Sequence, residues 1–222
     1  MTFAARIDHT LLRPDCTEAQ IIQLCDEAAA HGFATVCVPP CYVALAAGKL
    51  AGTAVGICTV IGFPLGYATS AAKFKEAEVA LYDGATELDM VINISALKSG
   101  KAAAIQDEIL DLADLCHVHQ ALLKVIIETA LLSEVEIELA AGLCVAGEAD
   151  FVKTSTGFAS RGASVADIEL LRRVLPETMR IKAAGGIRTR AAAEALVAAG
   201  ADRLGSSNSI ALLAESDESN AA

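Results

Sequence analysis

Short apolar runs and longer amphipathic segments alternate along the chain, from near its start to residue 214. The apolar runs are rich in Val, Ile and Leu, as expected for strands that are buried on both faces. A segment with helical spacing follows each run, so the 222 residues hold eight strand–helix units of about 28 residues each. The predicted strands cover residues 6–10, 34–38, 55–61, 86–92, 122–128, 150–154, 180–184 and 202–205.

The predicted helices carry start and stop signals. A hydroxyl residue stands three positions before an acid or amide at Thr17, Ser133 and Ser164, which is typical of a helix N-cap. Glycines suited to end a helix stand at Gly32, Gly84 and Gly200. This pattern predicts the α/β class and a single (β/α)8 TIM barrel. Residues 1–214 are expected to form this one domain, and the acidic residues 215–222 a polar, disordered tail.

Composition is consistent with one buried core, because 54% of the residues are hydrophobic and the mean hydropathy is +0.48. The seven cysteines include no C-x-x-C pair, which favours the reduced thiols of a cytoplasmic protein. Neither a secretion signal nor an uncharged apolar run long enough to span a membrane is visible. The formal net charge of −11 argues against nucleic acid or an anionic membrane as a partner.

Charged residues interrupt the predicted strands at or near their C-terminal ends. In a (β/α)8 barrel, sites are built at that end, from the loops that follow the strands. Unpaired charges in five different strands would be costly if they served the fold alone. We therefore expect one converging polar cluster, formed by Asp8, Asp89, Glu128, Lys153 and Lys182.

Lys153 is the leading candidate for a nucleophile. It ends an apolar run and precedes small residues in "KTSTG", which leave room for a carbonyl substrate. An amine attacks a carbonyl only when it is neutral, and a second ammonium nearby lowers the pKa of a lysine. Lys182 stands at the end of the next predicted strand and is placed to be that cation. The alternative is that each lysine only snorkels or pairs with a carboxylate, but two in consecutive strands favour a site.

Asp89 and Lys124 are the other charged candidates. Carbonyl–amine chemistry needs a group that moves protons, and Asp89 is expected to do this directly or through water. A plain salt bridge of Asp89 to a lysine is compatible with that role. Lys124 lies earlier in its strand, on the same face as Glu128 by the two-residue period. We interpret it as an ion-pair partner of Glu128 or Asp89.

Two glycine- and serine-rich turns are candidate anion sites. "AAGGIR", residues 183–188, opens a helix, and "LGSSNS", residues 204–209, follows the last predicted strand. Glycine lets backbone N–H groups approach an anion, and a helix N-terminus adds a favourable dipole. Phosphate sites of these barrels follow strands seven and eight, where both turns fall.

Other polar features are expected to carry no chemistry. "CHVH", residues 116–119, lacks a third ligand at usable spacing, so no metal site is predicted. His9 stands at a strand end, and no Ser–His–Asp arrangement is indicated around it. Cys37 is expected to lie in the core, with lining of the site as the alternative.

Six motifs occur in the order seen in deoxyribose-phosphate aldolases, a family that the chain resembles over nearly its whole length. They are "IDHTLL" at Ile7, "IGFPLG" at Ile61, "ELDMVIN" at Glu87, "LLKVIIET" at Leu122, "FVKTSTGF" at Phe151 and "KAAGGIR" at Lys182. The resemblance implies a TIM barrel and a metal-independent class I aldolase, a lyase of carbohydrate degradation without a cofactor. The family reversibly cleaves 2-deoxy-D-ribose 5-phosphate to D-glyceraldehyde 3-phosphate and acetaldehyde, in deoxyribonucleotide catabolism.

The matching motifs also imply roles for individual residues. Lys153 corresponds to the Schiff-base lysine, Lys182 to the lysine that lowers the pKa of the reactive amine and donates protons, and Asp89 to the proton-relay acid. Asp8, Lys124 and Glu128 are expected as supporting residues because of their positions in the strands. The implied sugar and phosphate shell is Thr10, Thr156, Gly157, Gly185, Gly186, Arg188, Gly205, Ser206 and Ser207. The partners would be small phosphosugars and aldehydes, and the protein a homodimer or homotetramer.

The chain departs from the family at several positions, among them Pro39, Asn208 and Ser209, and one departure concerns a phosphate contact. Some members carry Lys after the "TSTG" glycine, where this chain has Phe158, and Arg161 is a candidate replacement for that phosphate contact. Two other functions stay open at this point. One is another Schiff-base barrel enzyme, such as a keto-acid aldolase or a transaldolase, which would need an arginine for the substrate carboxylate. The other is a non-catalytic phosphosugar-binding barrel, which would keep the glycine turns without needing two lysines.

Overall fold

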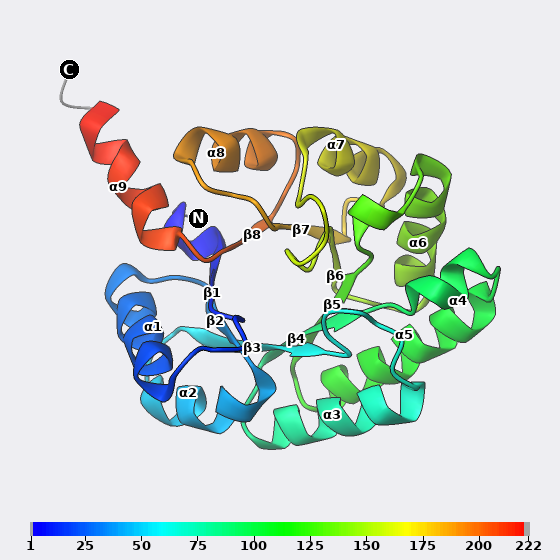
Figure 1. Cartoon of the computed structure of the whole chain (residues 1–222), viewed down its shortest axis with the longest axis horizontal. Coiled ribbons are helices and arrows are strands. Elements are labelled where there is room, and N and C mark those ends of the chain that lie inside the picture. The colour runs from blue at the N-terminus through cyan, green and yellow to red at the C-terminus, as the bar shows by residue number, and fades with distance from the viewer. Residues whose placement is uncertain (1, 220–222) are drawn as a thin grey trace.

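A computed structural model describes residues 2–219, with side chains over residues 2–214. Eight parallel strands close into a barrel in sequence order, and helices surround it (Figure 1). The predicted α/β class and single (β/α)8 barrel are confirmed. The strands are β1 Ile7–Thr10, β2 Thr35–Val38, β3 Gly56–Ile61, β4 Glu87–Val91, β5 Leu122–Ile126, β6 Phe151–Lys153, β7 Arg180–Ala184 and β8 Arg203–Ser206.

The helices follow the strands in the expected alternation. They are α1 Glu18–His31, α2 Val43–Lys49, α3 Ser70–Tyr82, α4 Ile94–Lys98, α5 Ala102–Val118, α6 Glu134–Ala146, α7 Val165–Val174, α8 Arg190–Ala198 and α9 Ser209–Ser219, with short 3-10 turns at Ala4–Arg6, Pro40–Tyr42 and Thr129–Leu131. None of the helices in the described part of the chain is long and apolar enough to cross a membrane.

Local sequence signals account for where several helices begin and end. Thr17 and Ser133 form complete capping boxes with Gln20 and Glu136, so two of the otherwise unpaired backbone N–H groups are satisfied at each start. Gly32 adopts φ +66° at the end of α1, a left-handed conformation that glycine takes without steric cost.

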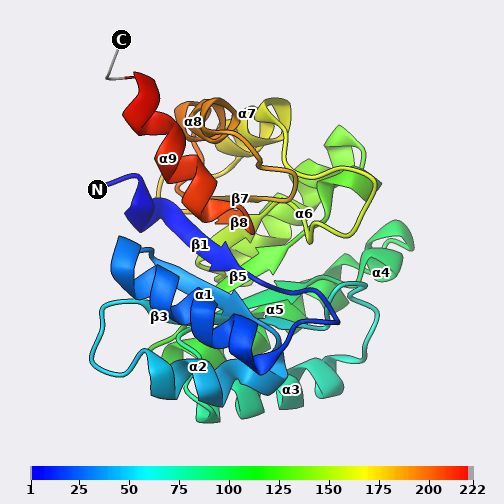
Figure 2. The same ribbon diagram turned by 60° about the vertical axis from the view of Figure 1, so that its left-hand side comes forward.

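The C-terminal helix α9 lies beside the N-terminal segment in both views (Figures 1 and 2). The guanidinium of Arg190, in α8, stacks 3.5 Å from the ring centroid of Phe3 nearby. The boundary expected at residue 214 falls inside α9, whose backbone is helical to Ser219. The rest of the predicted tail, residues 220–222, lies outside the described residues.

The apolar core lies mainly between the barrel and its ring of helices, where side chains such as Ile21, Leu88, Ile109 and Ile181 are buried. The barrel interior differs, because it holds fully or almost fully buried charges as well as apolar groups. The interiors of such barrels are usually filled by branched aliphatic side chains. Buried charges persist only where they are paired, so this interior requires an ion network.

Candidate active site

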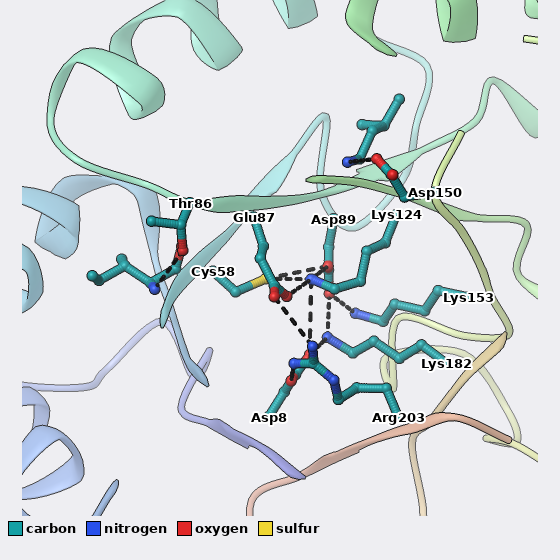
Figure 3. A network of polar contacts seen from close by, with 12 residues as sticks. Asp8, Cys58, Thr86, Glu87, Asp89, Lys124, Asp150, Lys153, Lys182 and Arg203 are labelled. Atoms are coloured by element: carbon teal, nitrogen blue, oxygen red, sulfur yellow. Dashed lines mark hydrogen bonds and ion pairs between the residues drawn. The ribbon is translucent and has the colours of Figure 1, made fainter. Parts of the chain in front are cut away.

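Lys153 and Lys182 are direct neighbours, as the strand order predicts. Lys153 ends β6, Lys182 lies in β7, and the two are paired in the parallel register. Both ammonium groups donate to the same carboxylate oxygen, Oδ2 of Asp89, at 2.7 Å each (Figure 3). The two cations therefore face each other with one carboxylate oxygen between them, which offsets part of their mutual repulsion.

The second oxygen of Asp89 is held from the other side. Oδ1 accepts from Lys124 Nζ at 2.8 Å and from the Cys58 thiol at 3.2 Å. Asp89 is fully buried, and burial alone would raise its pKa. The ammonium groups of Lys124, Lys153 and Lys182 outweigh burial and hold the pKa of Asp89 well below its usual range.

A second layer of charges lies behind this group. Lys182 also pairs with Asp8 Oδ2, and Arg203 pairs with Asp8 Oδ1 at 2.5 Å. Burial disfavours the charged form of each of these three residues, but their mutual attraction is stronger. The pKa of Asp8 is consequently lowered, and the pKa values of Lys182 and Arg203 are raised. Lys182 is thus held as an ammonium ion.

Lys124 is the ammonium with the most carboxylate partners in this network. Its Nζ lies 2.5 Å from Glu87 Oε2, 2.8 Å from Asp89 Oδ1 and 3.8 Å from Asp8 Oδ2. Although burial opposes charge, these carboxylates raise the pKa of Lys124 well above its usual value. Within the described residues, two donor groups have a spacing that suits a metal ion, Cys37–Cys58–Asp89 and Asp8–Cys58–Glu87. The Lys124 ammonium contacts Cys58, Glu87 and Asp89, so donors of both groups already pair with a cation.

A cavity of about 670 Å³ opens beside this network at the C-terminal end of the strands. Of the three lysines around Asp89, Lys153 lines the cavity, whereas Lys124 and Lys182 are buried behind it. The nine residues expected to form the sugar and phosphate shell all line it: Thr10, Thr156, Gly157, Gly185, Gly186, Arg188, Gly205, Ser206 and Ser207. Cys37 is fully buried in a small cluster with Cys58 and Val60, in agreement with the expected core position.

The two predicted anion turns lie together on one wall of the cavity. Gly185 and Gly186 have φ values of +85° and +74°, so both depend on the conformational freedom of glycine. At Gly185 a Cβ would also lie 3.0 Å from the Cα of Gly162. The side-chain hydroxyl of Ser206 donates to the carbonyl of Ile187, and the side-chain amide nitrogen of Asn208 donates to the carbonyl of Arg188. The two turns therefore support each other.

The predicted polar cluster is wrong in one member. Glu128 lies outside the network, because β5 ends at Ile126 and Glu128 adopts the left-handed φ of +55°. Of the two partners expected for Lys124, Asp89 is therefore the one that it pairs with. The Glu128 carboxylate instead accepts hydrogen bonds from the amide and hydroxyl of Thr156, and so supports the loop after Lys153.

Arg161 is bound elsewhere and does not line the cavity, so it does not replace the missing lysine. It pairs with Asp167 and donates to the carbonyl of Thr129. Phe158 lines the cavity rim, 54% exposed, with its ring edge-on to Phe63 at a centroid distance of 5.3 Å. This part of the rim is therefore apolar.

Three residues of the network escaped the sequence analysis. Glu87 and Arg203 begin their strands, where charges are usually solvated, and Cys58 is one of several buried cysteines. Signals for the first two were present, because Glu87 lies two residues before Asp89 on the same strand face and Arg203 is the register partner of Lys182.

Comparison with known proteins shows the family of this chain. A family model described as DeoC/LacD family aldolase matches residues 2–214. A deoxyribose-phosphate aldolase of Rhodospirillum rubrum is 52% identical over 96% of this chain and 89% of its own length. One of Mycoplasmoides pirum is 47% identical over 97% of this chain and 98% of its own. The solved deoxyribose phosphate aldolase of Aeropyrum pernix, described as a unique tetramer, is 37% identical, with a TM-score of 0.91 over 98% of this chain and 91% of its own. The chain therefore belongs to the DeoC/LacD family of aldolases.

Proposed function

We propose that this chain reversibly cleaves 2-deoxy-D-ribose 5-phosphate to D-glyceraldehyde 3-phosphate and acetaldehyde through an imine on Lys153. Relatives named deoxyribose-phosphate aldolase match nearly the whole chain. The observation that carries the proposal is that Lys153, of the three lysines around Asp89, lines the cavity. A carbonyl carbon entering the cavity would meet that amine before the other two.

Cleavage begins when the neutral Lys153 amine attacks C1 of the open-chain sugar. Loss of water from the carbinolamine leaves an iminium, which withdraws electrons from the C2–C3 bond. A base takes the proton of the 3-hydroxyl as that bond breaks, and glyceraldehyde 3-phosphate departs. The remaining two-carbon enamine is protonated at C2 and hydrolysed to acetaldehyde, which regenerates the amine.

Asp89 and Lys182 are the proposed proton carriers. Asp89 is held ionised, so it accepts a proton only briefly and passes it on, directly or through water. Lys182 is held as an ammonium ion by Asp8 and Asp89, and it shares Asp89 Oδ2 with Lys153. A proton that leaves Lys153 therefore finds Asp89 Oδ2 as an acceptor at hydrogen-bond distance. Lys182 lies on the far side of that oxygen as a donor.

The phosphate is proposed to bind at the paired turns of Gly185–Gly186 and Ser206–Ser207. Their backbone N–H groups and hydroxyls precede helices α8 and α9, and a helix N-terminus favours negative charge. Arg188 lines the same cavity and supplies a cation there. Such local donors are needed because the chain as a whole is acidic, with a net charge of −11.

Trapping with borohydride in the presence of acetaldehyde, followed by peptide mapping, tests the proposal. The ethyl adduct is expected on the peptide that contains Lys153 and should disappear in Lys153→Ala. Lys124→Met is the matched control, because it removes another buried lysine of the network without touching the cavity wall. An adduct on Lys124 or Lys182 would contradict the assigned roles, and no adduct at all would contradict imine chemistry.

We further propose that the protein works as a homodimer or homotetramer in the cytoplasm. The Aeropyrum pernix relative is described as a tetramer. Helix α6 exposes Val135 and Leu139, at 75% and 43%, which an interface between copies would cover. Light scattering coupled to size-exclusion chromatography measures the assembly, and a monomer would contradict the proposal.

A further inference from the structure

His9 is a buried, partnered residue that the mechanism above does not use. It lies in β1, 4% exposed, with its ring 5.0 Å from the ring of Phe33, and it lines the cavity. Its Nε2 lies 2.8 Å from Glu27 Oε2 in α1, and its Nδ1 lies 2.9 Å from the hydroxyl oxygen of Ser209. His9 thus belongs to a Ser–His–Glu chain of hydrogen bonds, which no pattern in the sequence indicated.

This chain does not have the layout of a hydrolytic triad. Ser209 is fully buried, and its hydroxyl donates to the carbonyl of Ser206 at 3.0 Å. A nucleophile would need access to substrate, which this hydroxyl lacks. The hydrogen bonds instead connect α1, through His9 and Ser209, to the backbone of the turn after β8.

That turn is the proposed phosphate site, and it has supports on two sides. Towards β7, Ser206 and Asn208 donate to the carbonyls of Ile187 and Arg188. On the opposite side, Ser209 and His9 tie it to β1 and α1, about 200 residues away in sequence. The backbone ladder between β1 and β8 also reaches Ser206, so the His9–Ser209 contact adds a side-chain support to the turn on this side.

The donor and acceptor of each hydrogen bond between Glu27, His9, Ser209 and Ser206 follow from the chemistry of these groups. A carbonyl only accepts, so the Ser209 hydroxyl donates to Ser206, and His9 Nδ1 must then donate to Ser209. The Glu27 carboxylate also only accepts, so Nε2 donates as well. Burial lowers the pKa of His9, while Glu27 favours the charged ring and His31 opposes it. All three hydrogen bonds form together only when both ring nitrogens of His9 carry a proton. A neutral ring has one N–H group and keeps two of the three bonds.

We propose that His9 and Glu27 are positioning residues for the phosphate group of the substrate, acting through Ser209 on the Ser206–Asn208 turn. The inference rests on the proposed function, because it assigns this turn to phosphate. His9 itself need not touch the substrate. Its contribution is to hold the turn in one conformation before the phosphate arrives, which lowers the ordering cost of binding.

Ser209→Ala is the most direct test. It removes the hydroxyl that joins His9 to the turn and leaves the His9–Glu27 contact in place. The KM for deoxyribose 5-phosphate is expected to rise about 3- to 10-fold, the effect of one hydrogen bond, with kcat changed by less than about twofold. Cleavage of unphosphorylated deoxyribose should stay within about twofold of wild type. Thr59→Val is the matched control, since it deletes a buried hydroxyl that donates to the carbonyl of Val38, away from the cavity.

A second pair of variants separates positioning from packing. Glu27→Gln keeps an acceptor for His9 Nε2, whereas Glu27→Leu removes it from a side chain that is 31% exposed. The Gln variant should retain the wild-type KM for the phosphorylated sugar, and the Leu variant should resemble Ser209→Ala. Equal losses on both substrates in Ser209→Ala, or no loss on either, would overturn the inference.

Calorimetric titration with inorganic phosphate separates this inference from the proposed function. Wild type is expected to bind phosphate, and Ser209→Ala to bind it about 3- to 10-fold more weakly, whether or not the sugar is cleaved. Equal affinities, or no binding by wild type, would contradict the positioning role. A wild-type protein that binds phosphate but does not cleave the sugar would contradict the proposed function alone.

Discussion

Replacing Lys124 with methionine should cost stability while the chemistry of Lys153 is retained. The Lys124 ammonium is fully buried and lies 2.5 Å from Glu87 and 2.8 Å from Asp89. Methionine fills a similar volume but carries no charge, so Glu87 Oε2 loses its 2.5 Å ammonium partner, and Asp89 Oδ1 keeps the thiol of Cys58 alone.

The size of the effect follows from breaking a buried ion pair on one side. Removing one partner of such a pair costs about 3–5 kcal/mol when the other charge stays buried without compensation. Here Arg203 still contacts Glu87, and two lysines still contact Asp89, so the loss is expected at the lower end, about 3 kcal/mol. For a domain of this length, about 1 kcal/mol corresponds to about 2–4 °C in Tm, so a fall of about 6–12 °C is expected. Urea unfolding followed by circular dichroism at neutral pH measures the free energy, and borohydride trapping below the transition measures the chemistry.

A second substitution shows whether the cost comes from the carboxylate left behind. Glu87→Gln in the Lys124→Met background removes that charge and keeps an oxygen for Arg203, which lies 3.2 Å from Glu87 Oε1. The double variant should regain at least about half of the lost stability. If Lys124→Met kept wild-type stability and lost the acetaldehyde adduct, Lys124 would be the reacting lysine and this reasoning would be refuted.

Three further predictions concern metal, phosphate and pH. Activity should survive EDTA, because the Lys124 ammonium already occupies the donor groups; a loss that a divalent ion restores would contradict this. Gly186→Ala should meet open space but strain a φ of +74°, at a cost of about 1–2 kcal/mol. The KM of the Gly186→Ala variant should therefore rise for the phosphorylated sugar and not for deoxyribose. An equal rise for both substrates would place the phosphate elsewhere. Asp8 and Asp89 have lowered pKa values in the folded protein, whereas the pKa of an unfolded Asp is about 3.9. The stability that these two carboxylates contribute is therefore present above about pH 4 and lost as the pH falls further. Equal unfolding free energies at pH 5 and pH 3 would contradict this.

The sequence alone determined the barrel and the pairing of the two lysines. Each strand of a (β/α)8 barrel pairs with the next one along the chain, so charges at the ends of consecutive strands become neighbours. Lys153 and Lys182 meet for this reason, and the turns after β7 and β8 share one wall. Capping residues such as Thr17 and Ser133 act within one helical turn, so their effect was also readable from local sequence.

Tertiary structure decided the contacts that cross the barrel or depend on a break in regular backbone. The period-two pattern placed Glu128 on the strand face of Lys124, but β5 ends before Glu128. Lys124 pairs with Asp89, as expected, and with Glu87, which was not expected. Which lysine faces the cavity depends on the depth of each side chain in the closed barrel, a quantity set by strand stagger and not by neighbouring residues.

The contact of His9 with Ser209 likewise required the closed barrel. Barrel closure pairs β1 with β8, and this brings the two ends of the chain together. Local patterns describe neighbours in sequence and in strand order, whereas the partners of a buried charge or hydroxyl are fixed by the three-dimensional packing that must satisfy it.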